Sequence, residues 1–396
     1  MGIRRSATVA VAATAMLIVG ACTPTQPGPT VTTTTAVPTW TPPGPGHGVR
    51  LNQIQLIGTH NSYHVGPIPH LLGVYGWWFN LLGPLAAGFG NFSELDYRHA
   101  PLTDQLNSGV RSLELDVWAD PLGGKFAHPS LATLLGVPEA PQPPAEMSQP
   151  GFKVLHIVDL DWNSTCYTLT ACLSEIKAWS DAHPGHLPIV IDVELKDDPL
   201  PAPLNITPVT KIDGAQEDAL DAEIRSVLPP AKLLTPDDVR GGAATLHQAV
   251  TTTGWPTVDS ARGKVMFYMD NEGGNYRTDY LAGHPSLSGR VLFTSSGEGQ
   301  DDGAVLKENT PGDGVAIKAL VAQGYFIRTR ADEALVGDTA RRDTAFASGA
   351  QIVSTDFPVA EPQVGTGYSA AFGTGTQARC NPIAVAATCA AIDISG

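Results

Sequence analysis

Positively charged residues are scarce in this chain. It has 24 Lys and Arg against 39 Asp and Glu, a formal net charge of −15, and only 16% of its 396 residues are charged. Nucleic-acid binding needs a concentrated basic surface that neutralises phosphates. We therefore expect no nucleic-acid partner. A phosphate ester substrate would need local neutralisation of its charge.

The apolar run at the N-terminus is too short, and ends too abruptly, for a membrane-spanning helix. It covers residues 7–19, follows Arg4 and Arg5, and leads into VGAC, which ends at Cys22. The pattern is typical of a secretory signal peptide. VGAC also resembles the lipobox of bacterial lipoproteins, in which the cysteine carries the lipid. We expect residues 1–22 to be a lipoprotein signal peptide, with a plain signal peptide as the alternative. The protein would be exported, and either anchored to the membrane at the cell surface or secreted.

Core-forming residues are few between positions 23 and 48, where Thr, Pro and Gly dominate. Such a segment cannot bury enough apolar surface to fold and is typical of an extended tether. We expect residues 49–396 to form a single domain and the protein to be a monomer.

Cysteines are also few, and four remain beyond Cys22. An even number in an exported chain suggests disulfides, and four cysteines allow three pairings. The short-range pairing, Cys166–Cys172 and Cys380–Cys389, is the most economical. A zinc site is the alternative, but neither pair has the two-residue spacing or the nearby histidines of a typical one.

Eight short apolar segments rich in Val, Ile and Phe predict strands buried on both faces. They cover residues 54–58, 111–118, 152–158, 187–195, 264–270, 290–295, 324–330 and 350–356. Segments with helical periodicity lie between most of them. This alternation predicts a (β/α)8 TIM barrel, regular or distorted, with a doubly wound open sheet as the alternative.

Polar side chains gather where the first four of these segments end. In a barrel the C-terminal strand ends share one mouth. An amide and three carboxylates there would form a set of hard oxygen donors suited to calcium or magnesium. Asn61 follows the first segment, Glu114 and Asp116 lie on the second, and Asp192 and Glu194 lie on the fourth. His60 and His156 beside such a cation suit phosphoryl chemistry, because imidazoles can move protons.

The tripeptide ELD occurs twice, and its context distinguishes the copies. In SLELDVW, Glu114 and Asp116 alternate with leucines and a valine, so both acids point to one face of a strand. The copy at Glu94–Asp96 lies among polar residues and Pro101 and is typical of a loop, where exposed acids need no metal.

Four motifs carry a resemblance to a known family. THNSY, GVRSLELDVW, VLHI and LPIVIDVELKD resemble the catalytic X region of phosphoinositide-specific phospholipases C, above all the secreted calcium-dependent bacterial enzymes. The resemblance covers residues 52–198, with weaker support from GYFIRTRAD and GAQIVSTDFP. It implies calcium as cofactor and a phosphatidylinositol-type lipid at a membrane surface as substrate.

The resemblance also implies residue roles. His60 would contact the phosphate, and His156 would be the second catalytic histidine, with His128 as a rival because a Pro-rich insertion precedes His156. Glu114 or Glu194 would act as base. The implied calcium ligands are Asn61, Glu114, Asp116 and Glu194.

Three basic residues are candidates for substrate binding. Lys196 follows the fourth strand, and Arg328 and Arg330 lie two apart on the seventh. The alternatives are a solvated strand end and a surface arginine pair. Residues 74–83, VYGWWFNLLG, are a candidate membrane-contacting rim, with a buried loop as the alternative.

Two other functions remain open from the sequence. A glycerophosphodiester phosphodiesterase would share the barrel, but its opening motif is usually HRG, and this chain has THN. A non-catalytic binding lipoprotein on a barrel scaffold would bind its ligand without metal and without turnover.

Overall fold

The computed structural model describes residues 48–82, 92–137, 139–200, 206–372, 378–384 and 389. The expected signal peptide, the lipobox cysteine Cys22 and all but the last residue of the expected tether lie outside these residues. Within the described ranges, no helix is both long enough and apolar enough to cross a membrane.

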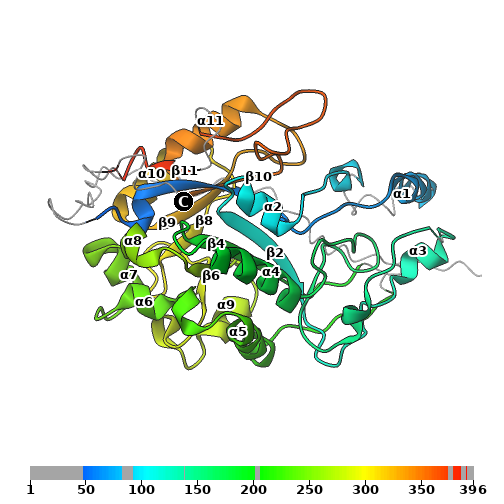
Figure 1. The fold of residues 1–396 in the computed structure, drawn as a ribbon, viewed down its shortest axis with the longest axis horizontal. Coiled ribbons are helices and arrows are strands. Elements are labelled where there is room, and N and C mark those ends of the chain that lie inside the picture. The colour runs from blue at the N-terminus through cyan, green and yellow to red at the C-terminus, as the bar shows by residue number, and fades with distance from the viewer. Residues whose placement is uncertain are drawn as a thin grey trace, which may run out of the picture.

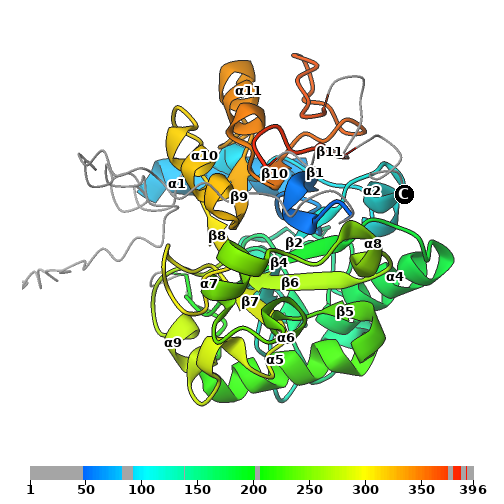
Figure 2. The ribbon, with the colours of Figure 1, turned by 90° about the vertical axis from the view of Figure 1, so that its left-hand side faces the viewer.

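Parallel strands form an irregular barrel at the centre, and helices surround it (Figures 1 and 2). The strands that make up the sheet are β1 (Ile54–Thr59), β2 (Ser112–Trp118), β3 (Lys153–Val154), β4 (Ile189–Lys196), β5 (Leu233–Leu234), β6 (Val265–Met269), β7 (Leu292–Thr294), β8 (Val305–Lys307), β9 (Phe326–Arg330), β10 (Ile352–Thr355) and β11 (Ala378–Cys380).

Eight of these strands are the staves of the barrel. Parallel pairing runs from β7 through β6, β4, β2, β1, β10 and β9 to β8. An isolated parallel bridge between Ser295 and Val305 joins β7 to β8. The expected fold class, a distorted (β/α)8 barrel, is confirmed.

The helices lie between most consecutive staves. Figure 2 shows α10 and α11 on one side of the sheet and α4, α5 and α6 on the other. Their bounds are α1 (Pro69–Leu82), α2 (Leu102–Asn107), α3 (Ser130–Leu134), α4 (Leu169–Ala182), α5 (Gly214–Val227), α6 (Pro236–Arg240), α7 (Leu246–Gln248), α8 (Val258–Ala261), α9 (Tyr276–Leu281), α10 (Val315–Gln323) and α11 (Thr339–Ser348).

The third expected strand is the main departure from the prediction. Residues 152–158 do not form a stave, because β3 spans two residues and pairs antiparallel with the end of β2. The chain then leaves the sheet in a loop that carries His156. The sequence missed β8, the stave that takes the remaining place.

Strand residues pack outward against helices in one large core. On β2, Leu113, Leu115 and Val117 are fully buried, and on α4 the side chains of Ile176 and Trp179 are buried too. Gly58 allows β1 and β2 to approach closely, because a Cβ at this position would lie 2.7 Å from the Cβ of Ser112.

Both expected disulfides are present, Cys166–Cys172 and Cys380–Cys389. The first ties the loop before α4 to the first turn of that helix. The second holds the end of β11, which pairs antiparallel with β1.

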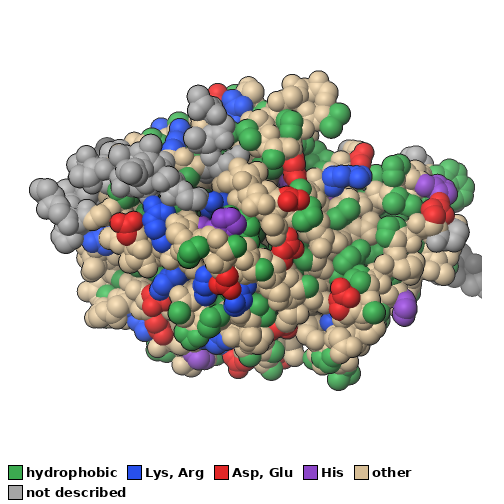
Figure 3. Space-filling view, viewed as in Figure 1, with side chains coloured by type: hydrophobic (Ala, Val, Ile, Leu, Met, Phe, Trp, Pro, Cys, Tyr) green, Lys and Arg blue, Asp and Glu red, His purple; other side chains and the backbone are tan. Residues whose placement is uncertain are grey.

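A smaller cluster lies beside the barrel, at the right of Figure 1. It joins α1 and α3 through Leu71, Tyr75 and Leu131 and includes Leu160 and Trp162 from the loop that follows β3. The Tyr75 hydroxyl donates to the Leu160 carbonyl oxygen at 2.6 Å. On the face in Figure 3, basic side chains lie among acidic ones rather than in one continuous patch.

Candidate active site

Four acidic side chains project into the barrel from two neighbouring strands. The parallel register pairs Glu114 with Asp192, and Asp116 with Glu194. Paired residues of a parallel ladder point to the same side, and residues two apart on a strand do as well. The leucines and valine between the acids of β2 therefore face the helices, as the alternation predicted.

Three of these acids can reach one ion. Glu114, Asp116 and Glu194 each offer an oxygen atom, and these atoms lie within 4.8 Å of one another. Both carboxylate oxygens of Asp116 are buried and have no hydrogen-bond partner among the described residues. Buried oxygens without donors are costly unless a cation contacts them.

Asn61 lies in the turn that follows β1, with a positive φ of 46°. The turn is tied to β2, because the Ser62 amide donates to the Glu114 carbonyl oxygen at 3.0 Å. The Asn61 side-chain amide donates to the Tyr97 hydroxyl at 2.9 Å, while its buried Oδ1 has no donor among the described residues. Asn61 Oδ1 and both Asp116 oxygens accept no hydrogen bond from the described residues. Together with oxygens of Glu114 and Glu194, they fit a calcium ion.

Two cations partly neutralise this acidic group. The Lys196 ammonium lies 3.0 Å from Glu194 and 3.4 Å from Asp116. The buried Arg328 guanidinium lies 2.6 Å from Glu114. Burial raises the pKa of Asp116 well above its usual value; Lys196 opposes this shift, and Glu194 and Glu114 add to it.

His60 is held by a carboxylate on the neighbouring strand end. Because Thr59 pairs with Thr355, the next residues, His60 and Asp356, are adjacent, and His60 Nδ1 lies 2.8 Å from Asp356 Oδ1. Arg330 contacts the other Asp356 oxygen at 3.0 Å. Burial raises the pKa of Asp356, but Arg330 and His60 outweigh it and hold the pKa below its usual value. His60 Nε2 points toward Glu114 Oε1, at 3.7 Å.

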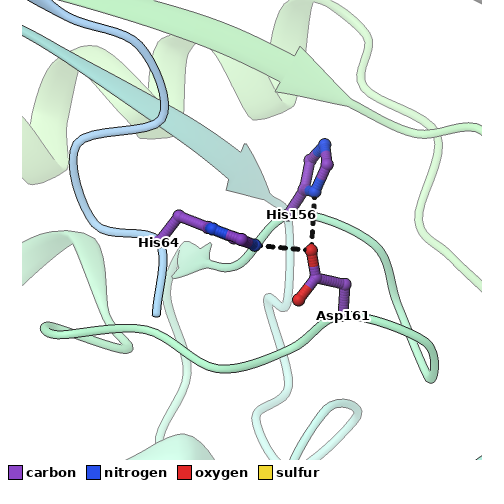
Figure 4. Close-up of side chains that lie close together, drawn as sticks. All are labelled: His64, His156 and Asp161. Carbon is purple, nitrogen blue, oxygen red and sulfur yellow. Dashed lines mark hydrogen bonds and ion pairs between the residues drawn. The ribbon is translucent and has the colours of Figure 1, made fainter. Parts of the chain in front are cut away.

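His156 is also held by a carboxylate (Figure 4). Its Nδ1 lies 2.8 Å from Asp161 Oδ2, and the same oxygen lies 2.6 Å from Nε2 of the buried His64. Burial lowers the pKa of His156, and Asp161 opposes this shift. The His156 side chain is 21% exposed, so it can reach a substrate from its loop.

The structure thus brings most of the expected site residues together, and it adds others. Asp161, His64 and Tyr97 carried no recognised signal, because they lie in loops without periodicity. Asp356 ends an expected strand, but nothing in the sequence distinguished it from Asp270, which forms an ion pair with Lys307 at 2.6 Å. The rival histidine His128 is exposed, just before α3.

The arrangement can therefore bind a divalent cation through oxygen atoms and place two imidazoles beside it. Each imidazole has one nitrogen next to a carboxylate, which fixes the ring and leaves the other nitrogen for a reacting group.

Known proteins share this arrangement of the chain. The family model for calcium-dependent phosphoinositide phospholipase C matches residues 49–382. No curated protein matches. A calcium-dependent phosphoinositol-specific phospholipase C from a Gram-negative bacterium, Pseudomonas sp, in an apo form, is 19% identical, with 84% of this chain and 95% of that chain covered and a TM-score of 0.52.

Two further solved structures are similar. The Pseudomonas sp enzyme in a myo-inositol complex is 18% identical over 84% of this chain and 96% of that chain, with a TM-score of 0.51. A Ca2+-dependent phosphatidylinositol-specific phospholipase C from Streptomyces antibioticus is 21% identical over 78% and 95%, with a TM-score of 0.49. The Pseudomonas structures show a shared fold. Because the family model spans residues 49–382, the chain belongs to the calcium-dependent phosphoinositide phospholipase C family of phosphodiesterases.

Proposed function

We propose that this protein cleaves phosphatidylinositol-type lipids into diacylglycerol and an inositol phosphate. One observation carries the proposal: oxygens of Asn61, Glu114, Asp116 and Glu194 gather at the barrel mouth, and those of Asn61 and Asp116 accept no side-chain hydrogen bond from the described residues. His60 Nε2 lies 3.7 Å from one of them, Glu114 Oε1. His156 is held by a carboxylate of its own on the loop that follows β3. Membership of the phospholipase C family supports the same substrate class over glycerophosphodiesters.

The proposed reaction is an in-line displacement at phosphorus. The inositol 2-hydroxyl oxygen forms a bond to phosphorus while the bond from phosphorus to the diacylglycerol oxygen breaks. Glu114 takes the hydroxyl proton, with Glu194 as the alternative base. His156, as the doubly protonated imidazolium, gives its Nε2 proton to the diacylglycerol oxygen, and His60 hydrogen-bonds a phosphate oxygen as negative charge develops there.

Calcium would be held by Asn61, Glu114, Asp116 and Glu194, where it offsets phosphate charge and makes the hydroxyl more acidic. Arg328 holds Glu114 in place through its 2.6 Å contact. Lys196, 22% exposed on its side chain, can bind a substrate phosphate or hydroxyl from the edge of the acidic group. The buried Arg330 orients Asp356 and, through it, His60.

Access to lipid would come from two features. A lipid on Cys22 would anchor the chain, and α1 would contact the membrane surface. Trp77 on α1 is 62% exposed and Leu134 at the end of α3 is 66% exposed, so both large apolar side chains are accessible to a lipid surface. Hydrophobic side chains lie over this part of the molecule at the right of Figure 3.

An assay of three substrates tests the proposal. Phosphatidylinositol, glycerophosphoinositol and phosphatidylcholine are each incubated with calcium and with excess chelator. We expect calcium-dependent release of diacylglycerol from phosphatidylinositol and little turnover of phosphatidylcholine. Calcium should also raise the melting temperature, because it binds the folded state. Full activity after complete removal of metal, or preference for glycerophosphoinositol, would contradict the proposal.

A further inference from the structure

The buried histidine His64 lies beside His156 but has no direct part in the proposed reaction. His64 belongs with Asp161 and His156 to a group that we call the histidine–aspartate cluster (Figure 4). The His64 side chain is fully buried, and its Nε2 lies 2.6 Å from the same Asp161 oxygen that contacts His156. The two imidazoles meet edge to face, with their centroids 5.5 Å apart.

Two imidazoles and a carboxylate can bind a transition metal, but the geometry of this cluster favours hydrogen bonds. Neighbouring ligand atoms of a tetrahedral zinc ion lie about 3.3 Å apart, given zinc–ligand bonds of about 2.0 Å. The nitrogen–oxygen distances here are 2.6 and 2.8 Å. A metal-bound histidine also usually donates from its second nitrogen, whereas His64 Nδ1 has no hydrogen-bond partner in the described part of the chain.

The direction of the hydrogen bonds follows from the charge on Asp161. Burial raises the pKa of Asp161, but the neighbouring His64 and the hydrogen bonds from both imidazoles outweigh it, and the pKa lies well below its usual value. An ionised carboxylate only accepts hydrogen bonds. Both imidazoles therefore donate to Asp161. Because His156 directs its Nδ1–H at Asp161, the proton that it can give to a substrate is the one that Nε2 carries when the ring is doubly protonated.

His64 is anchored independently of His156. Its amide donates to the Asn61 carbonyl oxygen at 2.8 Å, and its carbonyl oxygen accepts from the His99 amide at 2.8 Å. Its ring stacks on Tyr97 with centroids 4.0 Å apart. Asp161, in contrast, has one side-chain oxygen without any hydrogen-bond partner in the residues described. The side-chain contacts seen for its other oxygen are those to the two imidazoles.

We infer that His64 is a positioning residue for His156: it fixes the Asp161 carboxylate, and the carboxylate fixes the ring and tautomer of His156. This inference rests on the proposed function, in which His156 protonates the leaving oxygen. A fixed proton donor matters when the leaving group is a poor one, such as the alkoxide of diacylglycerol. It matters little when the leaving group is a nitrophenolate, which departs without a proton.

The test compares these two leaving groups. Turnover (kcat) at saturating calcium is measured with phosphatidylinositol and with inositol 4-nitrophenyl phosphate for the wild type, His64→Leu, His64→Gln and His156→Ala. We expect His64→Leu to lower kcat on the lipid by about tenfold or more, with the full contribution of general acid catalysis, about 10²–10⁴, as the upper limit. On the aryl substrate we expect a loss of less than about threefold. His64→Gln keeps a donor for Asp161 and should recover most of the loss.

A second buried histidine provides the control. His186 is 1% exposed and its Nε2 lies 2.8 Å from the Ser180 hydroxyl, beneath α4 and away from the cluster. His186→Leu should lower the melting temperature, as His64→Leu does, but leave the ratio of the two turnover rates unchanged. If His64→Leu does not fold, His64→Asn takes its place, because its shorter amide cannot reach Asp161.

The outcomes distinguish failure of the positioning role of His64 from failure of the proton-donor role of His156. Equal losses on both substrates, or none, in a folded His64 variant would overturn the positioning role. If His156→Ala itself lowers both rates equally, the assignment of His156 as proton donor fails, and with it that part of the proposed function.

Discussion

At the scale of single residues, Asp116 is where burial and charge conflict most directly. It is fully buried, its oxygens accept no hydrogen bond from the described residues, and its pKa is raised by burial although Lys196 opposes the shift. A carboxyl in this state tends to keep its proton. A bound divalent cation reverses that tendency, so occupancy of the site and ionisation of Asp116 are coupled.

The two ELD copies allow a matched test of the metal site. Glu114→Gln or Asp116→Asn should weaken calcium activation by about tenfold or more, since each removes a charged ligand. Glu94→Gln and Asp96→Asn change the same residue types at exposed positions and should have little effect. A calcium titration of activity on the four variants decides the matter. A larger shift from the second pair would refute both the metal site and the strand alternation.

The histidines can be ranked in the same way. His60→Ala and His156→Ala should each lower kcat by about a hundredfold or more without loss of the fold, because each removes a group at the reacting phosphate. His128→Ala should stay near wild type, since His128 is exposed before α3. Circular dichroism checks folding, and steady-state kinetics measures the ranking. A crippled His128 variant with a mild His156 variant would reverse the assignment.

At the scale of secondary-structure elements, the sequence predicted seven of the eight staves, missed β8, and took β3 for a longer strand than it is. β2 and β4 pair over seven residues, and their alternation of leucine or valine with acid is readable without a structure. β3 and β8 have two and three residues, too few for a periodic pattern, and their pairing depends on distant parts of the chain. The metal-site acids were therefore predictable, whereas Asp161 was not, because a loop after a short antiparallel strand places it.

The helix α1 is predicted to act at the membrane surface. Trp77→Ala should weaken binding to phosphatidylinositol-containing vesicles by roughly three- to tenfold, because about 1 kcal/mol or more of apolar burial is lost. Activity on water-soluble inositol 4-nitrophenyl phosphate should not change. Val315→Ala is the control, because Val315 is equally exposed, at 63%, on α10 at the opposite side of Figure 1. Equal vesicle binding by the two variants would exclude α1 as the contact.

The helix α5 contains a carboxyl whose burial should make stability depend on pH. Glu217 is fully buried, its two oxygens lack hydrogen-bond partners among the residues described, and burial, together with Asp279, raises its pKa to about 8. The unfolded chain ionises this group near its ordinary value of 4.5. Its contribution to stability is therefore complete below pH 4.5 and is lost as the pH rises toward 8.

Glu217→Gln should remove that loss. Its gain in unfolding free energy over the wild type should grow between pH 4.5 and 8 by at least about 1 kcal/mol, the equivalent of roughly one pKa unit. Urea unfolding at pH 5, 6.5 and 8 measures the gain. The exposed Glu94→Gln variant should show no such growth. A constant difference across this range would mean that Glu217 is ionised throughout.

At the scale of the whole molecule, the proposed active site and the proposed lipid-contacting surface lie next to each other. The loop after β3 carries His156 and Asp161, and its Leu160 and Trp162 pack in the same cluster as α1 and α3. The surface that would meet the membrane thus rests on the loop that would protonate the leaving lipid. If α1 contacts lipid as proposed, the smaller cluster beside the barrel would link that contact to the position of His156.

The junction of β7 and β8 determines where the barrel should open first by local unfolding. One bridge joins these staves, Ser295 with Val305, and the connection is braced by Asp302, which accepts from Thr294 at 2.6 Å and from Arg277 at 2.9 Å. Local unfolding begins where few backbone hydrogen bonds must break. In native-state hydrogen exchange, amides of β7 and β8 should therefore exchange faster than those of β2 and β4, and Asp302→Ala should widen the difference. Equal protection in the two pairs would show that side-chain contacts hold β7 and β8 together despite the single backbone bridge. Faster exchange in β7 and β8 would show that the barrel opens transiently at this junction into an open sheet with two unpaired edge strands.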